Sequence, residues 1–484
     1  MKDKIISIDQ GTSSTRSVLY DKKGQYIDSV QQEFDQLFPS EGWVEHNPDQ
    51  IWRTVVDTLS SLVQRNGLTS EEIASIGITN QRETTIVWNR KTGKPIYNAI
   101  VWQDRRTASF CEELVSYEKE IQKKTGLTID PYFSATKVNW LLSNIDGAAE
   151  LAQKGELLFG TVDTFLIWKM TEGQQHLTDV TNASRTMLFN IVDQEWDEEL
   201  LELFKIPRNM LPDVCDNVHN FGITNILGGD VSIGGVAGDQ QAALIGQCCF
   251  SPGEIKSTYG TGCFMIANTG DKPLYSENKL LSTIGYRIKG KTTYALEGSI
   301  FVAGSAIQWL RDGLSLFEDS AETESLSVKA SKDSKVLVVP ALTGLGAPYW
   351  DAEARGAIFG LTRDTGKEDI TKATLESIAF QSRDLLEAMK KDSASFERLM
   401  IDGGMVVNDW FSQKLANILE VEVIRPEIIE TTSLGAAFLA GLNADLFDDL
   451  TVLKKLKAIN KTFYPQEEEN RYLEWREAVK KVLT

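Results

Sequence analysis

Two stretches, one at the start of the chain and one near its middle, share a single pattern, and this repeat constrains the fold more than any other feature. Each has a short apolar segment, a polar loop rich in glycine and hydroxyl residues, and a second apolar segment; the stretches are residues 4–20 and 253–268. The pattern predicts a strand, a tight loop and a strand, so each stretch is a hairpin rather than a βαβ unit. Because no short tandem repeat is visible, we expect a duplicated domain and not a solenoid.

The rest of the pattern predicts an α/β protein. Apolar residues at helical spacing cover residues 48–63, 109–124, 137–142, 303–310 and 368–391, and strand-like runs cover 73–88, 231–237 and 336–339. We place the domain boundary between Gly246 and Gly253. This gives an N-terminal domain over residues 1–248 and a C-terminal domain over 249–484, each long enough to bury its own core.

Composition excludes several classes of protein. The 50 lysines and arginines stand against 69 acidic residues, a net charge of −19 that disfavours a nucleic-acid partner. No apolar run approaches the roughly 18 residues that span a bilayer, and the first residues lack the pattern of a signal peptide. The odd number of cysteines, five, contains no CxxC pair, and the three scattered histidines do not suit a zinc site. We therefore expect a cytoplasmic protein without membrane insertion.

Both hairpin loops have the residue types that bind phosphate. The first runs from Gly11 to Thr15 beside Asp9, and the second is Thr258–Gly262. Glycine and small hydroxyl residues let backbone N–H and side-chain O–H groups approach an anion closely. The neighbouring carboxylate would hold Mg²⁺ through water. The first loop is not a Walker A element, and alone it would be interpreted as an ordinary hairpin turn. Two such loops facing each other would hold a triphosphate from both sides.

Other candidate residues have an ordinary structural interpretation beside a functional one. Asp239 follows Gly238 at a strand-to-helix junction, where aspartate is a common helix N-cap. It could instead accept a proton from an attacking hydroxyl. Adjacent charges such as Arg82 and Glu83 point to opposite faces of a strand and are usually surface residues. Trp102, Tyr132 and Phe264 would normally be core aromatics, and the pair Gly403–Gly404 is a common turn.

Several motifs in order along the chain resemble those of one protein family. They are IDQGTSSTR (8–16), TNQRET (79–84), VWQDRR (101–106), AGDQQAA (237–243), TYGTGCF (258–264), GLGAPYWD (344–351) with ARGA (354–357), and DGG (402–404). With them the chain resembles the FGGY family of carbohydrate kinases, within the superfamily that shares the actin, hexokinase and Hsp70 ATPase fold. The resemblance implies two actin/hexokinase-like (ribonuclease H-like) domains with a nucleotide and substrate cleft between them.

The resemblance also implies an activity. The TNQRET and WQD motifs are similar to those of members that phosphorylate glycerol, rather than xylulose, ribulose or gluconate. The implied reaction is transfer of the γ-phosphate of ATP to glycerol, giving sn-glycerol 3-phosphate and ADP, with Asp239 as the general base. The alternatives are a family member that acts on another polyol or a ketose, and a catalytically silent ATP-binding regulator. The presence of Asp9, Arg82, Glu83 and Asp239 argues against the regulator.

Roles for individual residues follow from the same resemblance. The implied substrate-binding residues are Arg82, Glu83, Trp102, Tyr132, Asp239, Gln240 and Phe264. The implied ATP-binding residues are Thr12, Ser13, Ser14 and Arg16 on one side, Thr261 on the other, and Gly304, Gln308, Gly404 and Asn408 at the nucleoside. Asp9 would position Mg²⁺ through water. A homodimer or homotetramer is the implied assembly.

The resemblance does not extend to regulation. Residues 217–230 contain no Arg or Lys, unlike the basic loop of members inhibited by fructose 1,6-bisphosphate. His219 lacks the HFYG context of members activated by a phosphocarrier protein, and we interpret it as a surface histidine. Because an acidic enzyme must still attract ATP, we expect local electropositive groups, Arg16, Arg82 and the two loops, with the excess carboxylates on the outer surface.

Overall fold

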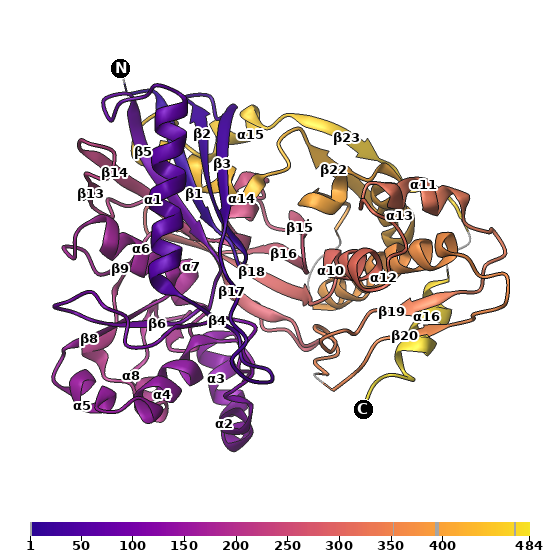
Figure 1. Cartoon of the computed structure of the whole chain (residues 1–484), viewed down its shortest axis with the longest axis horizontal. Coiled ribbons are helices and arrows are strands. Elements are labelled where there is room, and N and C mark those ends of the chain that lie inside the picture. Colours follow the sequence, from indigo (N-terminus) through magenta and orange to yellow (C-terminus); the bar gives the residue numbers. More distant parts are fainter. Residues whose placement is uncertain (1, 352, 393–395, 469–470) are drawn as a thin grey trace.

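The computed structural model describes residues 2–351, 353–392, 396–468 and 471–484, which form two lobes side by side (Figure 1). The first lobe is built on a six-stranded sheet in the order β13 (Ile223–Thr224), β14 (Val231–Gly238), β5 (Ile73–Asn80), β1 (Lys4–Gln10), β2 (Ser14–Asp21) and β3 (Tyr26–Glu33). The second is built on a seven-stranded sheet in the order β17 (Leu281–Ile288), β18 (Lys291–Ile300), β16 (Cys263–Gly270), β15 (Ile255–Tyr259), β21 (Arg398–Asp402), β22 (Glu422–Pro426) and β23 (Ile459–Phe463).

Short strand pairs and helices complete the lobes. The pairs are β4 (Glu45–His46) with β7 (Ala99–Ile100), β6 (Ile86–Asn89) with β8 (Leu157–Gly160), β9 (Leu177–Asp179) with β12 (Asp213–Cys215), β10 (Phe189–Asn190) with β11 (Glu195–Trp196), and β19 (Leu337–Val339) with β20 (Ala357–Phe359). The helices are α1 (Pro48–Arg65), α2 (Ala108–Glu113), α3 (Glu118–Thr125), α4 (Ser134–Asn144), α5 (Ala148–Gln153), α6 (Val162–Met170), α7 (Val180–Ala183), α8 (Glu198–Leu203), α9 (Asp239–Gly246), α10 (Gly304–Gln308), α11 (Glu322–Lys329), α12 (Lys367–Asp392), α13 (Asp409–Leu419), α14 (Thr431–Asn443), α15 (Leu450–Leu456) and α16 (Tyr472–Val479). None of these helices is both long and apolar enough to cross a membrane.

The two sheets repeat one strand arrangement, as the two hairpins predicted. In the first sheet β1 pairs antiparallel with β2 and parallel with β5, and β5 pairs parallel with β14. In the second sheet β15 pairs antiparallel with β16 and parallel with β21, and β21 pairs parallel with β22. One more antiparallel strand extends each hairpin: β3 pairs with β2 in the first sheet, and β18 pairs with β16 in the second, where β17 lies between them in sequence. The prediction of a duplicated α/β fold is confirmed.

Local sequence signals account for the helix α1. Pro48 is its first residue, and the side chain of Asn47 caps it by accepting hydrogen bonds from the backbone N–H groups of Asp49 and Gln50. Proline at this position costs no hydrogen bond, because the first N–H groups of a helix have no partner within it. The buried face, which includes Ile51 and Val55, covers β2 and β3. The predicted helix at 48–63 is therefore confirmed.

Two predicted helices differ from the observed structure. The segment 109–124 is not one helix: α2 and α3 are separated by a 3₁₀ turn at Val115–Tyr117. Valine, serine and tyrosine in succession have modest helix propensity, so a break in the helix there costs little free energy. The segment 303–310 forms α10 only to Gln308 and then widens into a π-helical turn at Trp309–Gly313.

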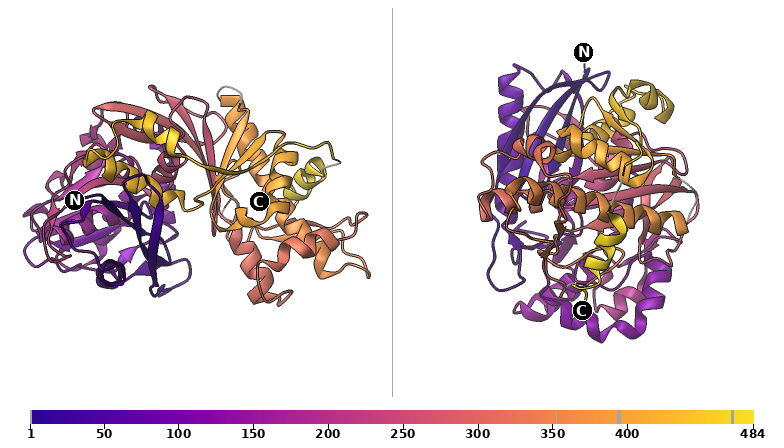
Figure 2. Two further views of the ribbon diagram at one scale, coloured as in Figure 1. Left: turned by 90° about the horizontal axis from the view of Figure 1, so that it is seen from above. Right: turned by 90° about the vertical axis from the view of Figure 1, so that its right-hand side faces the viewer.

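Helices α9 and α14 join the lobes. Although α14 follows β22 of the second sheet, it packs on β1, β5 and β14 of the first sheet and against α9. Glycines allow this close crossing: a Cβ at Gly435 would lie 1.8 Å from the carbonyl oxygen of Ala242, and one at Gly246 would lie 2.0 Å from that of Thr431. Seen from above, the lobes are joined on one side and diverge on the other (Figure 2). The domain division at residue 248 stays a prediction, because α14 contacts the first sheet.

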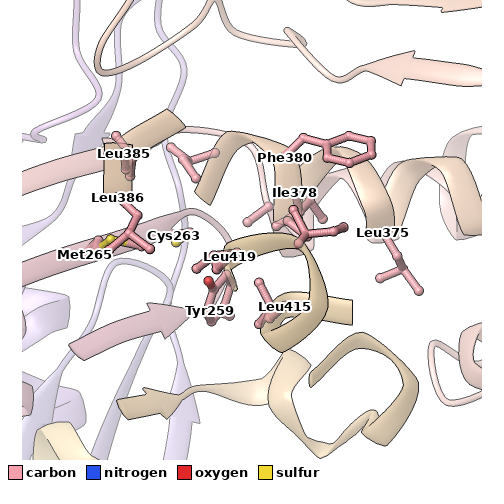
Figure 3. Packing of buried hydrophobic residues seen from close by; sticks show 14 of the residues in the cluster. Tyr259, Cys263, Met265, Leu375, Ile378, Phe380, Leu385, Leu386, Leu415 and Leu419 are labelled. Atoms are coloured by element: carbon pink, nitrogen blue, oxygen red, sulfur yellow. The ribbon is translucent and has the colours of Figure 1, made fainter. Parts of the chain in front are cut away.

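The hydrophobic core of the second lobe supports its hairpin. Figure 3 shows side chains of β15 and β16 packed against helices α12 and α13; those labelled are Tyr259, Cys263, Met265, Leu375, Ile378, Phe380, Leu385, Leu386, Leu415 and Leu419. The hydroxyl of Tyr259 donates a hydrogen bond to Ser382 Oγ over 3.0 Å, so this buried phenol is satisfied. The loop after Tyr259 therefore starts from a rigid strand.

Candidate functional site

The carboxyl ends of the parallel strands β1, β5 and β14 lie at one edge of the first sheet. Asn80, the last residue of β5, is level with Gln10 of β1 and with Gly238 of β14. The side chains just before or after these positions therefore gather at that edge, where open α/β sheets bind ligands. They include Asp9, the pair Arg82–Glu83, and Asp239.

Arg82 and Glu83 lie in a tight turn and not in a strand. The N–H of Thr84 donates to the carbonyl oxygen of Arg82 over 2.6 Å, and Glu83 has a φ of 60°, which is uncommon for a residue with a side chain. Both side chains are buried: Arg82 is 2 % exposed. Nε of Arg82 lies 3.1 Å from Oδ1 of Asp239 and 3.9 Å from Oε1 of Glu83. The interpretation of this pair as surface residues on opposite faces of a strand is therefore wrong.

Asp239 is the first residue of α9, and Gly238 is the N-cap. The interpretation of Asp239 as the cap itself is therefore wrong. A Cβ at Gly238 would lie 2.7 Å from the Cδ and Cγ atoms of Arg82, so glycine allows the arginine to approach. Burial raises the pKa of Asp239, while the positive charges of Arg82 and Lys256 oppose that rise. With 29 % of its side chain exposed, this carboxylate is suited to accept a proton from a bound ligand.

Three aromatic rings lie beside the charged residues Arg82, Glu83 and Asp239. The ring centre of Trp102 lies 5.7 Å from that of Tyr132 and 6.2 Å from that of Phe264. The guanidinium of Arg82 is 5.9 Å from the ring centre of Phe264. Tyr132 is buried, whereas Trp102 and Phe264 are half-buried. The structure thus brings together the aromatic and charged residues predicted to bind substrate, and Gln240 follows Asp239 on α9.

The first loop contacts the aromatic wall and carries the predicted phosphate-binding residues. Thr12 Oγ1 accepts a hydrogen bond from Trp102 Nε1 over 2.9 Å. Ser13 is exposed and Ser14 is half-buried at the start of β2. Arg16 extends from β2, where Nη1 lies 2.6 Å from Oε2 of Glu430, and Glu430 has 46 % of its side chain exposed.

The second loop is tied to the predicted nucleoside residues. The carbonyl oxygen of Thr261 accepts hydrogen bonds from the N–H groups of Ala303 and Ser305, which holds the loop against α10. A Cβ at Gly304 would lie 2.6 Å from the carbonyl oxygen of Gly260. Gly404 and Gln308 are exposed. Asn408 is the N-cap of α13, and its Nδ2 donates to Thr323 Oγ1 over 3.2 Å.

Comparisons with known proteins agree with this geometry. Residues 4–246 match the N-terminal domain, and residues 255–444 the C-terminal domain, of the FGGY family of carbohydrate kinases. The chain belongs to this family. Among the relatives of this FGGY kinase are the glycerol kinases of Marinomonas sp. (strain MWYL1), 56 % identical over 100 % of both chains, and of Bacillus subtilis (strain 168), 52 % identical over 100 % of this chain and 99 % of that one.

Solved structures show the same two-lobed fold. The glycerol kinase of Plasmodium falciparum with ADP superposes on this FGGY kinase with a TM-score of 0.90, at 38 % identity over 99 % of this chain and 98 % of that one. The gluconate kinase of Lactobacillus acidophilus superposes with a TM-score of 0.86, at 25 % identity over 99 % and 96 %. The predicted family and its actin/hexokinase-like fold are confirmed.

Three buried charged residues in the site of this FGGY kinase were not predicted from the sequence. Glu297 of β18 accepts two hydrogen bonds from Arg82, and Arg185, which follows α7, donates to both Glu83 and Glu297. Lys256 of β15 donates to Gln240 Oε1 over 2.6 Å. A lone charge inside an otherwise apolar or neutral strand segment, as in ALEGSI (295–300) and IKSTY (255–259), is the signal that could have found two of them.

Asp9 is the predicted magnesium residue of this FGGY kinase, and its surroundings suit a cation. Burial and the negative charges of Glu430 and Asp239 raise the pKa of Asp9 to about 7, while Arg16 opposes the rise. A divalent cation beside this carboxylate would offset that repulsion. Among the residues that the structure describes, no three His, Cys, Asp or Glu side chains form a group that could hold a metal ion. A single carboxylate fits Mg²⁺, which keeps several waters and binds phosphate oxygens.

The charges in the site are mixed. Both Arg16 and Arg82 were expected to make it electropositive, but Arg16 is paired with Glu430, and Arg82 with Glu297 and Asp239. These two arginines are therefore held in ion pairs at fixed positions and do not form an excess of positive charge.

Proposed function

We propose that this FGGY kinase is an ATP-dependent glycerol kinase that makes sn-glycerol 3-phosphate and ADP. The observation that carries the proposal is the gathering of Arg82, Glu83 and Asp239 with three aromatic rings at one sheet edge, next to the loop that contains Thr12. Glycerol is small and polar, so hydrogen bonds from several directions and a short apolar wall would distinguish it from larger sugars. The many relatives named glycerol kinase support the same choice.

In this proposal Asp239 is the general base. One terminal hydroxyl of glycerol transfers its proton to the carboxylate as its oxygen attacks the γ-phosphorus of ATP in line. The new O–P bond forms while the bond between the γ-phosphorus and the bridging oxygen breaks, and that oxygen leaves with ADP. The hydroxyls of glycerol are held by Arg82, Glu83, Tyr132, Asp239 and Gln240, and its carbon chain lies against Trp102 and Phe264. The raised pKa of Asp239 favours proton uptake.

We place ATP between the lobes. Its phosphates are bound by Thr12, Ser13, Ser14 and Arg16 from the first lobe and by Thr261 from the second; Gly304, Gln308, Gly404 and Asn408 line the nucleoside. Asp9 would hold Mg²⁺ through water, and the cation would neutralise charge on the phosphate oxygens. Glu430, the present partner of Arg16, is partly exposed and can yield to a phosphate group. Closure of the lobes would exclude water and so limit hydrolysis of ATP.

The family resemblance supports three further proposals. The chain works in the cytoplasm, it assembles as a homodimer or homotetramer, and it divides near residue 248 into a glycerol-binding and a nucleotide-binding domain. Light scattering after size-exclusion chromatography measures the assembly directly. A mass equal to that of one chain would contradict the proposed oligomers.

A substrate panel tests the proposed activity. ADP release by the purified chain is coupled to a spectrophotometric assay with glycerol, erythritol, xylulose, ribulose and gluconate as acceptors. We expect kcat/KM for glycerol to exceed that for every other acceptor by about tenfold or more, because only glycerol fills the polar groups without steric conflict. A higher value with another acceptor would assign a different polyol or ketose. ATP binding without ADP release on any acceptor would indicate the silent regulator.

A further inference from the structure

Glu297 connects the substrate-binding arginine to the second half of the chain. It lies on β18 of the second sheet, whereas its partners Arg82 and Arg185 follow β5 and α7 of the first lobe. Oε2 and Oε1 of Glu297 accept hydrogen bonds from Nη1 and Nη2 of Arg82 over 2.5 and 2.9 Å. Such a two-point contact fixes both the place and the plane of a guanidinium. Glu297 is 0 % exposed, so water does not loosen the pair.

The carboxylate of Glu297 is also linked to Glu83 through a second arginine, Arg185. Nη2 of Arg185 donates to Oε1 of Glu297 over 2.9 Å, and Nε of Arg185 donates to Oε1 of Glu83 over 2.6 Å. Nη1 of Arg185 has no hydrogen-bond partner among the described residues. Among the described residues, the guanidinium of Arg185 therefore donates hydrogen bonds only to Glu83 and Glu297, and Glu297 is linked to both charged residues of the predicted substrate pair.

The geometry leaves one edge of Arg82 directed at the proposed base. Because Glu297 takes the Nη1–Nη2 edge, the Nε side faces Asp239, 3.1 Å from Oδ1. Nη1 also donates to Gln241 Oε1 over 3.1 Å, but this is a single contact with a neutral group. Without Glu297 the guanidinium could therefore turn its two-point edge toward Asp239 and pair with it fully. The carboxylate of Asp239, which must accept the proton, would then be occupied by its ion pair with Arg82. Arg82 would also leave the place from which it meets a ligand hydroxyl.

We propose that Glu297 is a positioning residue for phosphoryl transfer, which holds Arg82 directly and Glu83 through Arg185 in the orientation that binds the acceptor and leaves Asp239 free to accept its proton. This inference rests on the proposed function and adds a residue that no family motif in the chain contains. The arginines keep Glu297 ionised: they lower its pKa to about 2 despite its burial. The charged form is the one that makes the two-point contact.

Two substitutions test the role. Glu297→Gln keeps the size but removes the charge, and Glu297→Asp keeps the charge but withdraws it by one methylene. In both, we expect kcat to fall and the acceptor KM to rise, each by about tenfold or more, because small displacements of positioning groups have large effects on rate. We expect the ATP KM to stay within about twofold, because the contacts of Glu297 lie on the acceptor side. Acceptor binding without ATP, measured by titration calorimetry, should weaken in parallel.

A matched control separates positioning from folding. Glu45 is also a buried carboxylate that pairs with a buried arginine, Arg106, and it accepts hydrogen bonds from Tyr97 and Asn98. Glu45→Gln should lower the melting temperature as Glu297→Gln does, since both leave a buried guanidinium short of a partner. Its kcat and acceptor KM should stay within about twofold of wild type.

The outcomes distinguish this inference from the proposed function. The assays use the acceptor that the wild-type chain phosphorylates best, so a failure of glycerol in the panel overturns the substrate but still tests Glu297. If both Glu297 variants lose stability but keep wild-type kcat and acceptor KM, Glu297 is structural only and the inference is wrong. If Glu297→Gln does not fold, Glu297→Asp decides: normal acceptor kinetics reject the role, and the expected split between acceptor and ATP constants supports it.

Discussion

The two halves of the chain have the same arrangement of strands but carry different types of residue at the strand ends. In the first hairpin, the second cross-strand pair counted from the loop is Asp9 with Arg16. The corresponding pair of the second hairpin is Thr258 with Phe264. The turn after β5 carries the charged pair Arg82–Glu83, and the end of β21 is followed by Gly403–Gly404. The scaffold is duplicated, while the residues at its strand ends are not.

This difference indicates how the halves divide the work. Charged side chains at the strand ends of the first half can exchange a proton and bind hydroxyls, phosphates and a cation. Glycines and hydroxyl residues in the second half would let the backbone approach a flat nucleoside closely, as we propose. Lys256 and Asp402 are buried charged exceptions in the second half. Lys256 of the hairpin donates through Nζ to Gln240 of the first half, and Asp402, the last residue of β21, accepts a hydrogen bond from Gln247. The chemistry of the site therefore comes from the residues at the strand ends and not from the fold itself.

The largest effect should come from Asp239, the proposed base, which directly follows β14. Asp239→Asn keeps the size of the side chain but cannot accept the proton, so we expect kcat to fall by about a hundredfold or more. ATP affinity, measured by calorimetry, should change little. Asp384→Asn is a matched control in the second half, because this buried aspartate accepts hydrogen bonds from Tyr349 and Tyr472. Near-wild-type turnover by Asp239→Asn would reject the assigned base.

The halves should also differ in their response to acid, because all three histidines lie in the first half. Burial lowers the pKa of His46 from 6.5 to about 3 and that of His176 to about 4. The unfolded chain therefore binds protons that the folded chain does not between about pH 6.5 and these values, and stability falls as the pH falls through this window. At about pH 5 the contribution of His46 alone should be a loss of about 2 kcal/mol.

Urea unfolding at about pH 7 and about pH 5 measures this loss. In His46→Gln the difference in unfolding free energy between the two pH values should shrink. His219→Gln, at an exposed histidine, serves as the control for the substitution itself. An unchanged pH dependence in His46→Gln would mean that other groups cause the acid sensitivity.

Much of the fold and part of the site could be predicted from sequence, for physical reasons. The hairpins and α1 have local signals, since glycine loops, caps and apolar spacing act within a few residues. The family motifs located Asp9, Arg82 and Asp239. Glu297 and Arg185 could not be found in this way, because their roles arise only when strands far apart in sequence meet. Likewise, the positive φ of Glu83 depends on the turn that packing imposes after β5.

A smaller effect is expected at the charged turn of the first half. Glu83→Gln removes the charged acceptor that we propose for a glycerol hydroxyl, and we expect the glycerol KM to rise about tenfold. The ATP KM should not change, since Glu83 lies with Arg82 and Arg185 on the acceptor side. Steady-state kinetics with each substrate varied in turn measures both constants. An unchanged glycerol KM would show that Glu83 serves only to pair with Arg185.

The smallest effect should come from the corresponding glycine turn of the second half, where neighbouring glycines make an internal comparison. Gly403 has a φ of 91°, and a Cβ there would lie 2.5 Å from the carbonyl oxygen of Tyr259, so Gly403→Ala should destabilise the fold. Gly404 is exposed, and a Cβ there would have no atom within 4 Å. Gly404→Ala should therefore melt as wild type does.

If the backbone at Gly404 lies against the nucleoside, the added methyl group of Gly404→Ala should raise the ATP KM by about threefold and leave the glycerol KM unchanged. The opposite result, a normal ATP KM in a stable Gly404→Ala variant, would remove this residue from the nucleotide site. The contrast with Glu83→Gln is then decisive for the division of work. The substitution in the turn after β5 should alter only the KM for the acceptor. The substitution in the corresponding turn after β21 should alter only the KM for ATP.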